Sequence, residues 1–244
     1  MFGKTLLSLA KNRVLCYTFF VTEIFWRYYK SVADSVFFDL DGTLTDSAEG
    51  ITKCAQLALS HFGLDYPDLN ELKVFVGPPL REMFPKFGVP AEKVEEAVTV
   101  FRSRYLTVGK FENSPYDGIV EMLEALKRMG KKLYIATSKP EKIAKEILAH
   151  FDLDKYFDNI CGATMDGSRD SKESVIAYLL SETKDLGSVV MVGDTDFDVI
   201  GAASHGISTI GVSWGYGKVS DMEAAGAKAI ANTPKELFEL IAKE

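Results

Sequence analysis

The sequence contains little cysteine, no low-complexity tract and no long uninterrupted apolar run. Its three cysteines, Cys16, Cys54 and Cys161, lie far apart and without C-x-x-C spacing. We therefore expect neither a disulfide framework nor a zinc site, and we predict that each cysteine is a small buried residue. This cysteine usage fits a reducing compartment, so a cytoplasmic location is expected.

The apolar segment 14–26 is the part of the chain that most resembles a membrane segment. It is shorter than the ~20 apolar residues needed to span a bilayer, and it contains Glu23. The basic stretch before it is similar to the start of a signal peptide, but no small-x-small cleavage site follows. We expect residues 1–34 to be an N-terminal extension of unassigned structure, with no membrane partner.

Positive charge is also scarce. The chain has 28 Lys and Arg against 35 Asp and Glu, a net charge of −7, so we do not expect a nucleic acid as partner. With 244 residues, 47% of them hydrophobic, it can form one large domain with an insertion or two small domains. Its oligomeric state stays open between a monomer and a homodimer.

What the sequence does contain is a repeated alternation of short apolar runs and helical patterns. Strands are expected at 35–38, 132–136, 159–162, 189–192, 209–212 and 227–231. Helices are expected at 119–129, 140–151, 171–181, 198–203 and 234–242. Continuous apolar strands alternating with helices predict an α/β fold, a Rossmann-like parallel sheet covered on both faces.

The stretch from Ser47 to Pro115 interrupts this alternation, because it contains helical patterns and no convincing strand. The patterns cover 51–62, 69–76, 80–87 and 91–106, with Gly- and Pro-rich breaks between them. We predict a small α-helical cap domain at 48–114, inserted into a core domain formed by 35–47 and 115–244.

Acidic residues follow two of the expected strands. Asp39 and Asp41 come directly after the first strand, and Asp194 comes after the strand at 189–192. Parallel sheets place their ligand sites beyond the carboxyl ends of the strands, and residues two apart on an extended segment face the same side. Two carboxylates this close repel each other. Magnesium, which prefers oxygen ligands, would remove the repulsion, so Mg²⁺ is predicted with Asp194 as a further ligand.

Hydroxyl and cationic groups are expected at the same edge of the sheet. Thr137 and Ser138 end the second strand, and Lys172 stands at the start of a helix.

At this point a family resemblance becomes clear. Residues 39–45, Asp-Leu-Asp-Gly-Thr-Leu-Thr, resemble the first motif of the haloacid dehalogenase-like hydrolase superfamily. Thr137, Lys172 and Gly193-Asp194 with Asp198 resemble its second, third and fourth motifs, in the same order. The insertion, 75–80 and 213–217 are similar to bacterial phosphoglycolate phosphatases and 5′-nucleotidases. One departure is Glu173, where the family often has proline.

The resemblance implies a mechanism and a role for each motif residue. Asp39 would be the nucleophile, forming an aspartyl-phosphate, and Asp41 the general acid and base. Phosphate would be bound by Thr137, Ser138 and Lys172. Magnesium would be held by Asp39, the carbonyl oxygen of Asp41 and Asp194, while Asp198 would orient Lys172 or a metal-bound water.

The resemblance leaves the substrate open. A small phosphorylated metabolite is expected, with phosphoglycolate favoured over a nucleoside 5′-monophosphate. A phosphomutase and a non-catalytic binding protein are the remaining alternatives, whereas Asp41 argues against a dehalogenase. In the insertion, Gly77, Pro78 and Pro79 are candidates for a loop that faces the substrate, and Arg81 could meet a substrate carboxylate.

Overall fold

The protein has a six-stranded parallel sheet at its centre. The computed structural model describes residues 33–243, and the sheet has the strand order β5-β4-β1-β6-β7-β8. The strands are β1 Ser35–Phe38, β4 Lys132–Pro140, β5 Asn159–Ala163, β6 Val189–Gly193, β7 Ser208–Val212 and β8 Ala229–Ala231. Every neighbouring pair in the sheet is parallel, which confirms the predicted fold class.

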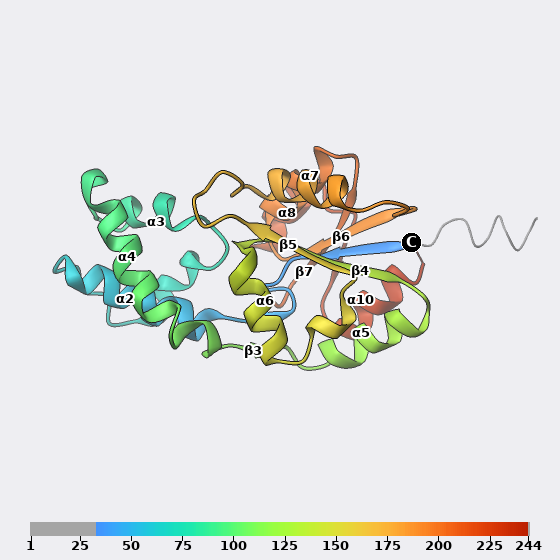
Figure 1. The fold of residues 1–244 in the computed structure, drawn as a ribbon, viewed down its shortest axis with the longest axis horizontal. Coiled ribbons are helices and arrows are strands. Elements are labelled where there is room, and N and C mark those ends of the chain that lie inside the picture. The colour runs from blue at the N-terminus through green and yellow to red at the C-terminus, as the bar shows by residue number, and fades with distance from the viewer. Residues whose placement is uncertain (1–32, 244) are drawn as a thin grey trace, which may run out of the picture.

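Helices cover both faces of the sheet (Figure 1). One face carries α5 Ile119–Arg128, α6 Glu141–His150 and α10 Pro234–Ile241, and the other carries α7 Lys172–Glu182 and α8 Asp196–Ala203. Val36 and Phe38 of β1 pack into the first layer and Phe37 into the second. Because successive side chains of a strand point to opposite faces, β1 needs an unbroken apolar run.

The helical insertion forms a separate cluster beside the sheet (Figure 1). It consists of α2 Ala48–His61, η1 Leu69–Phe75, α3 Leu80–Lys86, η2 Ala91–Lys93, α4 Val94–Tyr105 and η3 Gly109–Phe111. Phe75, Phe84 and Phe101 lie in its hydrophobic core, to which α6 adds Ile143 and Ile147. The insertion therefore has apolar packing of its own and rests on one helix of the sheet layer.

Two strands and one helix are among the short elements that were not predicted. Strands β2 Thr45–Asp46 and β3 Ser114–Pro115 pair antiparallel where the chain leaves and re-enters the sheet region. The prediction of no strand between Ser47 and Pro115 is therefore wrong at the C-terminal end of that stretch, where β3 lies. Helix α9 Val219–Ala224 also went unnoticed. Elements of two to six residues are too short to show a period of 2.0 or 3.6 residues in the sequence.

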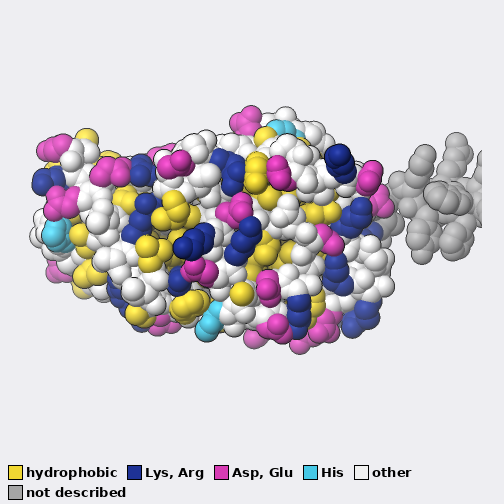
Figure 2. All heavy atoms as spheres, in the orientation of Figure 1, with side chains coloured by type: hydrophobic (Ala, Val, Ile, Leu, Met, Phe, Trp, Pro, Cys, Tyr) yellow, Lys and Arg dark blue, Asp and Glu magenta, His cyan; other side chains and the backbone are white. Residues whose placement is uncertain are grey.

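Two expectations from composition can be compared with the described residues. Cys54 and Cys161 are buried and form no disulfide, as predicted, whereas Cys16 and the segment 14–26 lie outside the described residues. No helix within 33–243 is long and apolar enough to cross a membrane. On the face drawn in Figure 2, acidic and basic side chains are interspersed.

Candidate active site

The sheet order brings the chemically important strand ends together. Strand β1 lies between β4 and β6, with Phe38 in register with Ile135 on one side and Val192 on the other. Asp39, Thr137 and Asp194 therefore emerge next to each other at the carboxyl edge. Strand β4 extends four residues beyond its predicted end at Ala136, with a register shift between Thr137 and Pro140.

Asp39 shares a buried cation with Asp198. The Lys172 ammonium lies 2.7 Å from Asp39 Oδ1 and 2.7 Å from Asp198 Oδ1, and it donates a hydrogen bond to the Ala136 carbonyl oxygen at 2.9 Å. Burial disfavours the charged lysine, but the two carboxylates outweigh it and raise the pKa of Lys172. The geometry places Lys172 beside the predicted nucleophile.

Helix α7 explains why Lys172 can reach this site. The helix begins at Lys172, and the Ser171 hydroxyl caps it by accepting a hydrogen bond from the Ser174 backbone N–H. A Ser cap satisfies one of the free N–H groups of the first turn. Because Glu173 continues the helix and is exposed, the absence of the family's proline does not displace Lys172.

Asp194 forms the third side of a buried acidic cluster. Carboxylate oxygens of Asp39, Asp194 and Asp198 lie within 4.8 Å of one another. Asp194 accepts hydrogen bonds from the Tyr216 backbone N–H at 2.8 Å and from the Thr43 hydroxyl at 3.3 Å. Burial, followed by the charges of Asp198 and Asp39, raises the pKa of Asp194 to about 8.

This cluster fits a divalent cation. Three buried carboxylates surround one ammonium, so the site has an excess of negative charge and offers only oxygen donors. Oxygen donors with surplus negative charge are what Mg²⁺ requires. Asp198 is already occupied, since its second oxygen accepts from the Thr195 backbone N–H and hydroxyl at 3.0 and 2.9 Å. Asp39 and Asp194 are thus the side chains placed to hold a metal.

Two glycines let the chain pass close to Asp194. Gly42 has φ +82°, and a Cβ there would overlap the Asp194 carboxylate and the Tyr216 ring. At Gly215 a Cβ would also overlap Asp194. The turn around Gly215 and Gly217 therefore brings the Tyr216 N–H within hydrogen-bonding distance of the Asp194 carboxylate. A side chain at Gly42 or Gly215 would push its segment away from Asp194.

The Asp41 side chain points to a different partner. One of its oxygens forms an ion pair with Lys139, whose side chain is 4% exposed. The Lys139 ammonium lies 5.3 Å from the centre of the Tyr105 ring on α4. Sequence reasoning missed Lys139 and Tyr105, although Lys139 stands two residues after Thr137 on the same strand. The only sequence feature that could have pointed to Lys139 is its position at the end of this strand, beside the other candidate site residues.

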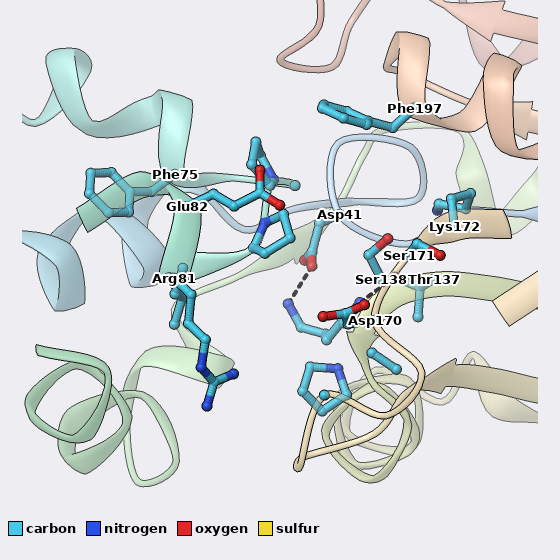
Figure 3. A pocket seen from close by; sticks show the side chains of 18 of the residues that line it. Asp41, Phe75, Arg81, Glu82, Thr137, Ser138, Asp170, Ser171, Lys172 and Phe197 are labelled. Carbon is cyan, nitrogen blue, oxygen red and sulfur yellow. Dashed lines mark hydrogen bonds and ion pairs between the residues drawn. The ribbon is translucent and has the colours of Figure 1, made fainter. Parts of the chain in front are cut away.

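The hydroxyl residues lie where they were predicted. Thr137 is buried, and its hydroxyl accepts a hydrogen bond from the Lys139 backbone N–H at 3.2 Å. Thr137, Ser138 and Lys172 line one cavity together with Asp39 and Asp41. Figure 3 shows Thr137, Ser138 and Lys172 gathered on the same side of this cavity, near Asp41.

The cavity extends from this edge into the helical insertion. Its volume is about 430 Å³, and most of the lining that the insertion contributes is apolar, including Phe75, Val98 and Phe101. The predicted loop lies in its wall, since Gly77, Pro78, Pro79 and Arg81 all line it. Ile200 and Phe197 of α8 line it as well, and both are more than half exposed.

Arg81 does not point a free guanidinium at the cavity. Its Nε and Nη2 atoms donate to the two oxygens of Glu95 at 2.5 and 3.0 Å. This bidentate pair uses the geometry that was expected to bind a substrate carboxylate. Arg81 is therefore already engaged by its own chain.

Comparisons with known proteins agree with this arrangement. Residues 36–212 match the family model described as haloacid dehalogenase-like hydrolase. A 5′-nucleotidase from Pseudomonas aeruginosa is 44% identical over 192 residues, 78% of this chain and 87% of that protein. A phosphoglycolate phosphatase from Aquifex aeolicus is 37% identical over 189 residues, 76% of this chain and 87% of that protein.

A relative that is named as a kinase rather than a phosphatase has a similar level of identity. The tyrosine-protein kinase PtkA from Mycobacterium tuberculosis is 43% identical over 209 residues, 84% of this chain and 72% of that protein. Among solved structures, a predicted phosphatase from Clostridium acetobutylicum superimposes with a TM-score of 0.83 and 42% identity, covering 88% of this chain and all of that one.

Proposed function

Because the chain belongs to the haloacid dehalogenase-like hydrolase family, we propose that this phosphatase is magnesium-dependent and works through an aspartyl-phosphate on Asp39. The observation that carries the proposal is the buried cluster at the carboxyl edge of the sheet, where Asp39 meets Lys172 and Asp194 and also lines the cavity. A nucleophilic carboxylate needs this combination of access and nearby positive charge.

The reaction we propose has two steps, the formation and the hydrolysis of an aspartyl-phosphate. A carboxylate oxygen of Asp39 attacks phosphorus, the bond to the ester oxygen breaks, and Asp41 gives its proton to the departing alkoxide. Water then attacks the phosphorus of the aspartyl-phosphate while Asp41 takes its proton. The bond between phosphorus and the Asp39 oxygen breaks, which releases inorganic phosphate and restores the Asp39 carboxylate. Thr137, Ser138 and Lys172 bind the phosphoryl oxygens, and Asp198 orients Lys172 through their 2.7 Å ion pair.

The metal would be held by the carboxylates of Asp39 and Asp194 and by the carbonyl oxygen of Asp41. When bound, it supplies the positive charge that lets an anionic nucleophile approach an anionic substrate. The excess of carboxylates over ammonium groups in the cluster supports this assignment.

We propose in addition that 48–114 form a cap domain over a core domain made of 35–47 and 115–244. The separate hydrophobic cluster of the insertion supports this division, as does the β2–β3 pair at the two chain crossings. In this arrangement the core carries the reacting groups and the cap surrounds the leaving group. Substrate choice then depends on the cap side of the cavity.

Two substrate classes are candidates, one favoured by the sequence and one by the cavity. The sequence favours a phosphoglycolate-like metabolite, which has a small acidic leaving group. The cavity of about 430 Å³ with its apolar walls favours a nucleoside 5′-monophosphate as the second candidate, because a base and ribose would fill it.

The test is a screen of phosphorylated metabolites with Mg²⁺, in which phosphate release is measured and kcat/KM is determined for each substrate. We expect turnover of p-nitrophenyl phosphate and a preference of at least about tenfold for one of the two classes, since each buried contact to the leaving group changes transition-state binding by that order. The protein with Asp39→Asn is the blank. A chain that releases no phosphate from any monoester would contradict the proposed function.

Lys139 offers a separate test of the role given to Asp41. Lys139 holds the Asp41 carboxyl in place through their ion pair, so we expect Lys139→Met to misplace the general acid. It should lower kcat/KM for an alkyl phosphate roughly 10-fold to 100-fold more than for p-nitrophenyl phosphate, because nitrophenolate departs without a proton whereas an alkoxide needs one from a correctly placed Asp41. Lys142→Met, which changes an exposed lysine of α6, is the matched control. An equal loss for both substrates would mean that Lys139 does not act through Asp41.

A further inference from the structure

Arg102 differs from the other arginines of the described chain. Residues 33–243 contain five arginines, of which Arg81, Arg104, Arg128 and Arg169 each form an ion pair with a glutamate. For Arg102 no ion pair within 4.0 Å is present among these residues, yet it is partly buried and lines the cavity. Partial burial of a guanidinium without a carboxylate beside it costs free energy, and a bound anion would offset this cost.

The position of Arg102 follows from the face that α4 turns toward the cavity. Val98, Phe101, Arg102 and Tyr105 all line it, as expected for residues three and four apart on one helix face. Tyr105 marks the end of this face near the reacting groups, because its ring lies against Lys139, the partner of Asp41. Arg102 is three residues away, about 4.5 Å along the helix axis. Arg102 therefore lines a part of the cavity that lies beyond the reacting groups.

The charges around Arg102 leave it available. Burial lowers its pKa, and the nearby Arg81 lowers it further. Glu95 is the carboxylate that counteracts this effect, but both of its oxygens accept hydrogen bonds from Arg81. Glu82 and Asp170 also line the cavity, and neither forms an ion pair with Arg102. The repulsion between the two guanidinium groups would be relieved by an anion bound at Arg102.

We propose that Arg102 binds a second anionic group, a carboxylate or a further phosphate, carried by the leaving group of the substrate. This inference rests on the proposed phosphatase reaction and adds a specificity-determining residue to it. Arginine suits the task because its planar fork meets both oxygens of a carboxylate or phosphate. Arg102 thereby takes the role that was expected for Arg81, whose guanidinium is already bound to Glu95.

The experiment compares matched substrates that differ only in the second anion. Phosphoglycolate is paired with ethyl phosphate to test a carboxylate, and a nucleoside 3′,5′-bisphosphate with its 5′-monophosphate to test a phosphate. In at least one pair we expect the full chain to favour the anionic member by roughly 10-fold to 100-fold in kcat/KM, the range for a buried charge-assisted hydrogen bond. Arg102→Met should bring that ratio close to one, mainly through KM, and Arg102→Lys should retain part of it.

Turnover of p-nitrophenyl phosphate separates this inference from the proposed function. It should be nearly the same in the parent and in Arg128→Met, which removes an exposed arginine on α5 and serves as the control. If p-nitrophenyl phosphate is hydrolysed but neither pair shows a preference, or Arg102→Met keeps the ratio, the role of Arg102 is wrong and the phosphatase assignment stands. If no monoester is hydrolysed, both fail.

Discussion

The substitution Asp39→Asn is expected to abolish phosphatase turnover while the protein stays folded. An amide oxygen is a far weaker nucleophile than a carboxylate, so we expect kcat to fall at least about 10³-fold. The change is nearly isosteric, and Lys172 keeps Asp198 at 2.7 Å and the Ala136 carbonyl at 2.9 Å as partners. Circular dichroism and the melting temperature should therefore remain close to those of the parent.

Phosphate release with p-nitrophenyl phosphate provides the measurement, and acid-quenched protein should carry labelled phosphate in the parent and in the control but not in Asp39→Asn. Asp196→Asn is the matched control, since Asp196 belongs to the same strand-end segment as Asp194 but does not line the cavity. Activity of Asp39→Asn within tenfold of the parent would remove Asp39 from the role of nucleophile.

Removal of divalent cations is the second large effect. We expect EDTA to reduce turnover to background and Mg²⁺ to restore it, because the cluster of Asp39, Asp194 and Asp198 contains more carboxylates than the ammonium of Lys172 can balance. Metal binding to the folded chain should also raise the melting temperature. Asp194→Asn should increase the Mg²⁺ concentration for half-maximal activity at least about tenfold, because loss of a residue that holds or supports a metal ion usually lowers metal affinity by that order.

The thermal readout makes this prediction independent of activity. The melting temperature of the parent should rise with Mg²⁺, and Asp194→Asn should show a smaller rise at the same concentration. Asp221→Asn, an exposed residue on α9, is the control and should behave like the parent. Full activity in excess EDTA, with no effect of Mg²⁺ on melting, would contradict the metal assignment.

Much of the fold could be predicted because its signals are local. The predicted strand 35–38 coincides with β1, and the bounds of the other strands and of the helices shift by a few residues. A strand buried on both faces requires a continuous apolar run, which is visible in a single sequence. The β2–β3 pair was missed, since pairing between residues about 70 positions apart leaves no local trace.

That the candidate site residues lie together was predictable to a similar degree, whereas their roles stay predictions. Asp39, Thr137, Lys172 and Asp194 all line or adjoin one place at the carboxyl edge of the sheet, because the strand ends of a parallel sheet meet there. Arg81 shows where this reasoning ends. Its side chain pairs with Glu95, fourteen positions away on a different helix, and only the packing of α3 against α4 brings the two together.

The sequence by itself determined the α/β class, the helical insertion and the motif residues that mark the chain as a haloacid dehalogenase-like hydrolase. These features depend on residue type and spacing along the chain. The tertiary structure decided which charges are paired. In the folded chain Lys139 forms an ion pair with Asp41, and Glu95 forms one with Arg81. Arg102 lines the cavity. Electrostatic pairing depends on distances of a few ångströms between side chains from different elements, and these distances exist only once the elements have packed.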